Sequence, residues 1–165
     1  MEPTLSDRDG TPPCERVLVS IAASRPVSWF YVNVAPMLDR ALLRLTGGRL
    51  TTVGRHRVGY LRVIGAKSGI RRVTPLVYTL DGDRVILVAS RGGDSRHPAW
   101  YRNLVANPRV TFSIDGKERA YRARELGGQE RQEAWRRAVR RYPGYAIYQR
   151  RAGRRTIPLF LLDPA

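Results

Sequence analysis

A basic loop in the first half of the chain has the residue types that bind anions. The stretch Gly65-Ala66-Lys67-Ser68-Gly69-Ile70-Arg71-Arg72 lies between two apolar, β-branched runs. Such a loop offers backbone N–H groups, a hydroxyl and three cations to one small space, which suits a phosphate or another anion. The alternative is an ordinary hairpin turn with solvated basic residues, and a short motif of this kind is weak when taken alone.

A glycine pair marks a second group. Val88-Ala89-Ser90-Arg91-Gly92-Gly93 reads as a strand that runs into a loop, and Asp94-Ser95-Arg96-His97-Pro98 leads from there into a short helix. Glycines let the backbone approach a flat ring closely, and free amides at a helix start can take an anionic oxygen. Alternatively, Gly92-Gly93 is a flexible loop and Trp100 a core anchor.

Tyrosines form a third group near the C-terminal end. They lie at i, i+3 and i+6 in Tyr142-Pro143-Gly144-Tyr145-Ala146-Ile147-Tyr148-Gln149, and several arginines follow. This spacing predicts hydroxyls along one side of a pocket, or rings that pack against the body of the protein with their tips in water.

The sequence lacks the patterns of self-sufficient hydrolases and of metal sites. It has no paired carboxylates placed for acid–base work, no Gly-x-Gly-x-x-Gly and no P-loop. Cys14 is the single cysteine, and His56 and His97 are the two histidines, so we expect no metal. The reactivity would therefore come from a bound cofactor. A lone cysteine also fits a reducing, cytoplasmic location.

The charge predicts an acidic partner. The 165 residues include 30 Lys+Arg and 14 Asp+Glu, which gives a net charge of +16 and a pI of about 11.3. Nucleic acid, an anionic membrane surface and an anionic cofactor all fit such a surface. Local residues have to discriminate among them.

The periodicity predicts the elements that position these groups. Asp81-Gly82-Asp83 and Asp115-Gly116 signal tight turns, which join antiparallel strands. Helices are predicted over 97–106 and 129–141. We expect a mainly β fold with helices (α+β), in which six short strands close into a small barrel that removes exposed edges. The predicted strands are 58–64, 73–80, 84–90, 109–114, 118–126 and 156–162.

The N-terminal part has a different pattern. Residues 1–12 are polar and rich in proline, which predicts a disordered tail. Residues 13–48 carry apolar positions at helical spacing and form a predicted helical segment, followed by the barrel domain at 49–165. The aromatic cluster Trp29-Phe30-Tyr31 either packs these helices onto the body or forms a hydrophobic edge toward a membrane or a lipophilic substrate.

Together and in this order, the three groups resemble the deazaflavin-dependent nitroreductase family. Its members are small split β-barrel oxidoreductases that use the reduced 8-hydroxy-5-deazaflavin coenzyme F420. The resemblance extends over about residues 46–162 and is also carried by Asn107-Pro108 and Arg155-Thr156-Ile157-Pro158. It implies a six-stranded antiparallel split β-barrel with N-terminal helices. The implied activity is hydride transfer from reduced F420 to an electrophilic acceptor, such as a quinone, an activated alkene or a nitroaromatic.

The resemblance also implies roles for individual residues. The basic loop would grip the phosphate and acidic tail of the cofactor, residues 90–93 would line the deazaflavin ring, and Trp100 and Asn103 would brace that wall. Ala66 stands where the family usually has an arginine, and Arg71 can compensate. The implied cofactor-binding residues are Gly65, Lys67, Ser68, Gly69, Arg71, Arg72, Pro75, Ser90, Arg91, Gly92, Gly93, Trp100 and Asn103.

On the substrate side, the resemblance points to the tyrosine motif. Tyr145, together with Ser90, is the candidate that orients the substrate or helps to protonate it after hydride transfer. Tyr142, Tyr148 and Trp29 are the further candidates for substrate binding. Val77 stands where the family can carry an aromatic residue, which implies a differently shaped pocket.

Two alternatives remain at this stage. Barrels of this kind also bind FMN, so a flavin could replace F420. A non-catalytic basic module that binds nucleic acid or an anionic membrane is the second alternative. Basic and aromatic residues are not interleaved as in nucleic-acid readers, which argues against nucleic acid. Peripheral contact of residues 14–45 with the inner face of the membrane is compatible with the enzyme and would suit a lipophilic acceptor. The sequence leaves the oligomeric state open.

Overall fold

The computed structural model describes residues 58–165. The tail predicted at 1–12, the helical segment predicted at 13–48 and the substrate candidate Trp29 lie outside the described residues. Those expectations, and the domain boundaries drawn from them, therefore stay predictions.

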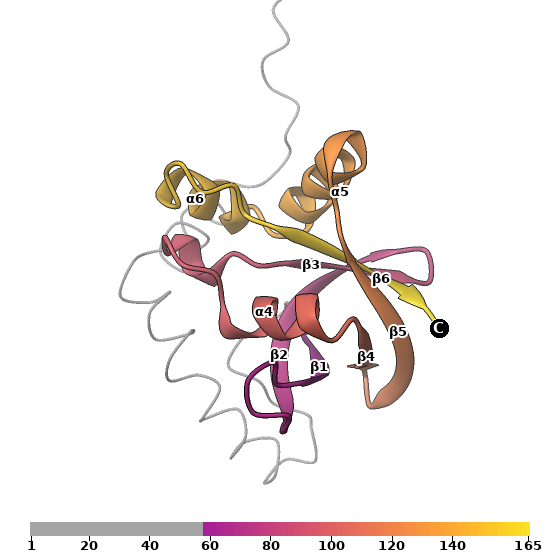
Figure 1. Ribbon diagram of the computed structural model, residues 1–165. Helices are drawn as coiled ribbons and strands as arrows, with labels where there is room; N and C mark the ends of the chain where they lie inside the picture. Colours follow the sequence, from indigo (N-terminus) through magenta and orange to yellow (C-terminus); the bar gives the residue numbers. More distant parts are fainter. Residues whose placement is uncertain (1–57) are drawn as a thin grey trace, which may run out of the picture.

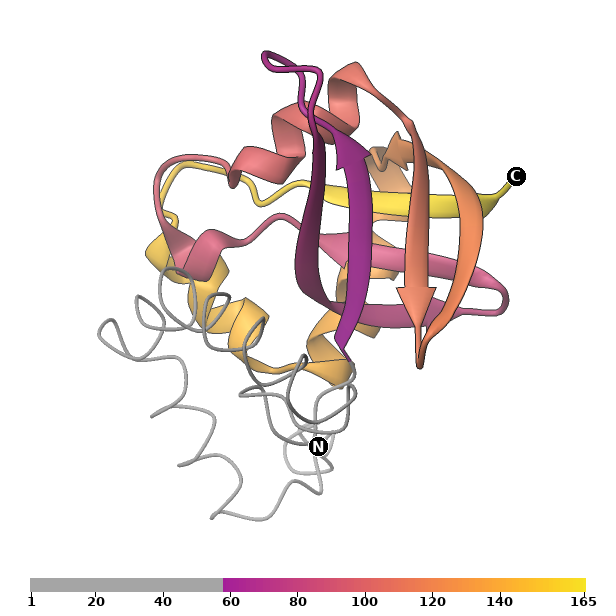
Figure 2. The same ribbon diagram turned by 90° about the horizontal axis from the view of Figure 1, so that it is seen from below.

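Six antiparallel strands form a closed barrel in the order β1-β2-β3-β6-β5-β4 (Figures 1 and 2). This confirms the predicted fold class and the antiparallel pairing. A closed barrel leaves no long unpaired edge to associate with another chain. The strands are β1 (Val58–Ile64), β2 (Arg71–Asp81), β3 (Arg84–Val88), β4 (Arg109–Ile114), β5 (Lys117–Glu125) and β6 (Leu159–Pro164).

Both predicted tight turns are present. Gly82 has φ 67° between β2 and β3, and Asp115 and Gly116 have φ 49° and 78° between β4 and β5. Positive φ at both central residues of the second turn is what a two-residue hairpin with the right twist requires. These turns set the registers that pair β2 with β3 and β4 with β5.

Helices cover two sides of the barrel. α4 (Ala99–Ala106) and α5 (Gly128–Arg141) lie close to their predicted bounds, whereas α6 (Gly144–Arg151) was missed. Pro143 directly precedes α6, where a missing N–H costs nothing, although the Tyr-Pro-Gly triplet reads locally as a turn. η1 (Arg91–Gly93) is a short 3₁₀ turn. No helix between residues 58 and 165 is both long and apolar enough to cross a membrane.

The buried residues form two clusters on the two faces of the same strands. Leu87 of β3 and Phe160 of β6 belong to the cluster inside the barrel, which Trp100 of α4 also joins. Ile86 and Leu161 belong to the second cluster, under α5 and α6 (Figure 1). β3 and β6 are covered on both faces, and this explains why they read as continuous apolar runs.

Candidate functional site

The basic loop is a closed hairpin connection between β1 and β2. The Gly65 N–H donates to the Ile70 carbonyl, and the Gly69 N–H to the Gly65 carbonyl, each at 2.9 Å. A Cβ on Gly65 would lie 2.7 Å from the Ser68 Oγ, and Gly69 has φ +65°. Gly69 therefore supplies a left-handed conformation that other residues adopt at a cost, whereas a side chain at Gly65 would require the Ser68 hydroxyl to rotate away.

The loop presents unused donors. The side chains of Lys67, Arg71 and Arg72 are exposed, and none of them forms an ion pair with another residue of the described range. Within that range, the N–H groups of Lys67 and Ser68 have no hydrogen-bond acceptor either. Three exposed cations and two backbone amides without acceptors among residues 58–165 are the kind of donors that bind an anion, so these residues fit a ligand with a phosphodiester.

Helix α4 fixes the position of this loop. The Ala66 N–H donates to the Asn103 Oδ1 at 3.0 Å, and the Asn107 Nδ2 donates to the Ile64 carbonyl at 3.1 Å. Asn103 therefore positions the basic loop. Trp100 is 7% exposed and lies in the barrel core, with its ring 6.1 Å from that of Phe160. The core interpretation of Trp100 is confirmed.

The glycine-pair loop has an unusual backbone. Arg91, Gly92 and Gly93 follow one another with φ of 49°, 64° and 83°. A left-handed conformation is costly for a residue with a side chain, so surrounding contacts must hold Arg91 in place. Gly93 is buried, and a Cβ there would lie 2.6 Å from the Tyr148 carbonyl oxygen. Only glycine lets this loop lie against α6.

Arg155 holds the loop, a role that sequence reasoning did not identify. Its Nε donates to the Asp94 carbonyl and its Nη2 to the Ser90 carbonyl, each at 2.9 Å, while its Nη1 donates to the Ala89 carbonyl at 3.3 Å. Burial lowers the pKa of Arg155, and the nearby Asp94 opposes that shift. The only sequence signal was its place in Arg155-Thr156-Ile157-Pro158.

Arg91 and Ser90, two further predicted residues of this loop, differ in whether their side chains contact other described residues. The Arg91 Nη1 donates to the His97 carbonyl at 3.2 Å, and its Nε lies 3.4 Å from an Asp94 carboxylate oxygen, so Arg91 braces its own loop. Ser90 is half-buried, and its hydroxyl forms no hydrogen bond with any described residue. That hydroxyl is available to a ligand.

The tyrosines are packed together. Tyr145 is 5% exposed and Tyr148 8%, and both belong to the cluster beneath α5 and α6. The Tyr142 and Tyr148 hydroxyls lie 3.0 Å apart, and the Tyr142 and Tyr145 rings meet edge to face at 5.0 Å. Burial raises the pKa of Tyr145, with a smaller contribution from Tyr148, so Tyr145 stays protonated in neutral solution.

The two loops lie on either side of α4. In both views, α4 is between the β1–β2 hairpin loop and η1 (Figures 1 and 2). Asn103 connects α4 to the hairpin loop, and residues 94–98 connect it to η1. The structure thus arranges the two predicted ligand-binding loops around one short helix. The individual roles of the predicted residues stay predictions.

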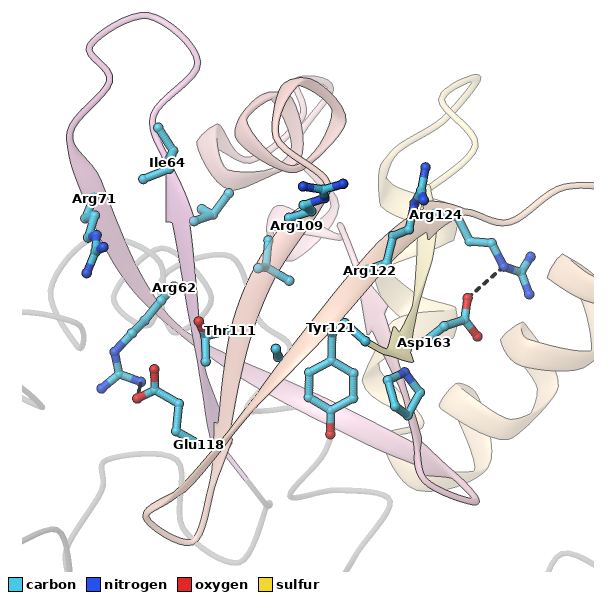
Figure 3. A pocket seen from close by; sticks show the side chains of 15 residues that line it. Arg62, Ile64, Arg71, Arg109, Thr111, Glu118, Tyr121, Arg122, Arg124 and Asp163 are labelled. Carbon is cyan, nitrogen blue, oxygen red and sulfur yellow. Dashed lines mark hydrogen bonds and ion pairs between the residues drawn. The ribbon is translucent and has the colours of Figure 1, made fainter.

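A hollow of about 770 Å³ lies elsewhere, on the outside of the barrel (Figure 3). Its lining comes from β1, β4 and β5, the start of β2 and the end of β6. Of the predicted site residues, Arg71 alone contributes to it. Five arginines line this hollow, namely Arg62, Arg71, Arg109, Arg122 and Arg124.

Comparison with known proteins identifies relatives. Residues 35–164 match a family model described as F420H(2)-dependent quinone reductase. An F420H(2)-dependent quinone reductase of Mycobacterium tuberculosis H37Rv is 40% identical over 98 residues, which are 54% of this chain and 63% of that protein. The aligned part therefore spans less than two thirds of that relative.

Two solved structures are similar over most of their own length. One, described as an F420-H2 dependent reductase, is 41% identical, with a TM-score of 0.61 over 65% of this chain and 94% of that one. The other, described as a domain-swapped dimer, is 36% identical, with a TM-score of 0.62 over 84% of this chain and 99% of that one. Both sequence identities are high enough to indicate a shared family as well as a shared fold.

Proposed function

Because the chain belongs to the F420H(2)-dependent quinone reductase family, we propose that it transfers a hydride from reduced F420 to a small electrophilic acceptor. The names of the relatives favour a quinone over an activated alkene or a nitroaromatic compound. The observation that carries the proposal is the basic loop, whose three cations and two backbone amides have no partner among residues 58–165.

The donor set agrees with the chemistry of this cofactor. F420 carries a phosphodiester and glutamate carboxylates, so a loop with Lys67, Arg71 and Arg72 suits it through charge-assisted hydrogen bonds. The loop is anchored to α4 by Asn103. The backbone amides of the loop are therefore positioned before a ligand arrives, which reduces the entropic cost of binding.

The reduced deazaflavin, when bound, supplies the hydride. The protein has to hold a flat ring and an acceptor together and keep water away. The Ser90 hydroxyl has no partner among the described residues and can donate to the ring or to the acceptor. Gly92, which has no side chain, leaves the backbone open to close approach. Tyr145 keeps its proton at neutral pH because burial raises its pKa, so it is our candidate to orient the acceptor through a hydrogen bond from its hydroxyl.

A titration with F420 and FMN side by side tests the proposal. We expect micromolar or tighter binding of F420, followed by fluorescence anisotropy, and much weaker binding of FMN. Lys67→Ala and Arg72→Ala should each weaken F420 binding by about tenfold, since each removes a charged hydrogen-bond donor. Arg136→Ala is the matched control, because Arg136 is exposed on α5 and away from the basic loop.

Unchanged fluorescence and anisotropy of F420 on addition of the protein would contradict the proposal. Preferential binding of FMN would show that the cofactor of this barrel is a flavin rather than F420. For the reaction itself, oxidation of reduced F420 in the presence of a soluble quinone is the readout. Ser90→Ala should slow that oxidation more than it weakens F420 binding, because the hydroxyl is assigned to the reacting end.

Peripheral membrane contact is a separate proposal, for a cytoplasmic protein at the inner face of the membrane. It is supported by the apolar segment 14–45 and by the net charge of +16, which suits anionic lipids. Sedimentation with vesicles that contain or lack anionic lipid tests it. We expect binding that depends on anionic lipid and is lost when residues 1–45 are deleted. The membrane proposal would be refuted if the full chain and the chain without residues 1–45 were recovered equally in the supernatant.

A further inference from the structure

The glycine-pair loop rests against helix α6. The two segments lie side by side in both views (Figures 1 and 2). Backbone meets backbone there, because a Cβ on Gly93 would lie 2.6 Å from the Tyr148 carbonyl oxygen. Two polar side chains of α6, Gln149 and Arg151, are half-buried at this contact. The proposed function gives neither of them a role.

Gln149 bonds to the backbone of the segment that follows α6. Its Nε2 donates to the Arg155 carbonyl at 2.8 Å, and its Oε1 accepts the Ile157 N–H at 2.9 Å. Both ends of the amide are therefore used, which fixes the backbone over three consecutive residues. The Arg155 guanidinium in turn donates to the Ser90 and Asp94 carbonyls. Gln149 therefore acts on the glycine-pair loop through Arg155.

Arg151 reaches the same loop directly. Its Nη1 donates to the Gly92 carbonyl at 3.2 Å. Its guanidinium carbon also lies 5.8 Å from the centre of the Tyr148 ring, within the range of a cation–π contact. One side chain thus contacts both the loop that is predicted to line the ring and a tyrosine that is predicted to bind the acceptor.

The same short helix carries the acceptor candidates. Tyr145 and Tyr148 are buried residues of α6, and Gln149 and Arg151 follow within about one helical turn. The loop contacts and the acceptor candidates therefore belong to one rigid element. Hydride transfer is sensitive to this arrangement, because a misplacement of about 1 Å between reacting groups can slow a reaction about a hundredfold.

We propose that Gln149 and Arg151 are positioning residues for hydride transfer, which hold the glycine-pair loop at a fixed place relative to Tyr145 and Tyr148. The inference rests on the proposed function for the identity of the ring and the acceptor, whereas the contacts from α6 to the loop do not depend on it. The basic loop, which would bind the phosphate, lies on the other side of α4. Loss of either contact should therefore slow hydride transfer more than it weakens coenzyme binding.

Three variants and one control test this inference. Gln149→Glu keeps the size of the side chain and the acceptor for the Ile157 N–H, but it loses the donor to the Arg155 carbonyl. Arg151→Gln removes the guanidinium, and Arg151→Lys keeps its charge without the planar fork. Arg150→Gln is the matched control, because it removes the same charge from an exposed neighbouring position on α6.

The first measurement needs no coenzyme. Hydrogen–deuterium exchange of a peptide that spans residues 89–94 reports how often the loop opens, because the Gly93 and Asp94 amides are hydrogen-bonded within it. We expect Gln149→Glu and Arg151→Gln each to speed exchange about fivefold, the factor that corresponds to one lost hydrogen bond. Arg151→Lys should be intermediate and Arg150→Gln unchanged. Wild-type exchange in both test variants would show that these side chains do not hold the loop, and the inference would fail.

The second measurement separates hydride transfer from binding. The single-turnover rate of reduced F420 oxidation at saturating soluble quinone is compared with the dissociation constant of F420, well below the unfolding temperature of every variant. We expect Gln149→Glu and Arg151→Gln to lower the rate about tenfold or more and to change the dissociation constant much less. Equal losses of rate and affinity, or no loss of rate, would overturn the inference.

The same experiment distinguishes this inference from the proposed function. If the wild type does not oxidise reduced F420, the proposed function fails and the inference fails with it. If the wild type is active and both variants react at its rate, the inference alone fails. A double variant, Gln149→Glu with Arg155→Met, tests the route through Arg155 and should react at about the rate of Arg155→Met alone. Independent, additive losses would contradict that route.

Discussion

Arg155 should determine the shape of the glycine-pair loop. Arg155→Met keeps most of the apolar stem and removes the guanidinium that bonds to the Ser90 and Asp94 carbonyls at 2.9 Å. A net contribution of about 1–1.5 kcal/mol for each of these two bonds gives a loss of about 2–3 kcal/mol in unfolding free energy. For a chain of this size, that is a decrease in melting temperature of roughly 5–10 °C.

The assay has two parts. Urea denaturation measures the loss of stability, and F420 titration well below the melting temperature measures the loss of affinity. Arg154→Met is the matched control, because Arg154 is the exposed neighbour. Arg155→Lys keeps the charge but loses the planar fork, so we expect an intermediate value in both measurements.

Two results would refute this reasoning. If Arg155→Met and Arg154→Met unfolded at the same urea concentration, the hydrogen bonds to the loop would contribute nothing. If Arg155→Met lost stability but bound F420 as tightly as the wild type, the loop would be held by Arg155 without taking part in cofactor binding.

Three further predictions concern backbone space and protonation. Gly93→Ala should lower the free energy of unfolding by more than about 2 kcal/mol, because its Cβ would lie 2.6 Å from a carbonyl oxygen of α6. Gly153 also has a positive φ but has open space around it, so Gly153→Ala should lower the free energy of unfolding by less. Urea denaturation midpoints measure both losses. The Arg96 N–H lowers the pKa of Asp94 below its usual 3.8, so Asp94 stabilises the fold at neutral pH and this contribution is lost as pH falls through the lowered pKa. Asp94→Asn should therefore be less stable than the wild type at pH 7, and the difference should shrink in acid below pH 3.8. Burial raises the pKa of Tyr145 above its usual 10.0, so the wild type should lose stability as pH rises past that value, and Tyr145→Phe should lose less, as urea midpoints on both sides of pH 10.0 would show.

The barrel could be predicted because its signals are local. Alternating and β-branched runs gave β1 and β4 at their observed bounds, and the turns at Gly82 and Gly116 fixed the antiparallel pairs. β6 begins at Leu159 rather than 156, after the Pro158 carbonyl has accepted the Ala89 N–H. That contact joins residues far apart in sequence, so periodicity alone does not show it.

The site was harder to predict because its contacts are tertiary. Helix α6 was missed, since a Tyr-Pro-Gly triplet reads as a turn until packing against the barrel is known. Several arginines follow the tyrosine motif, and nothing local shows that Arg151 and Arg155 are the ones that donate to carbonyls of the glycine-pair loop.

The most direct test of the account is an anisotropy titration of the purified chain with F420 and with FMN, repeated with Lys67→Ala. We expect saturable binding of F420, weaker binding of FMN and a clear loss of F420 affinity in the variant. No binding of F420, or binding that is indifferent to Lys67, would contradict it.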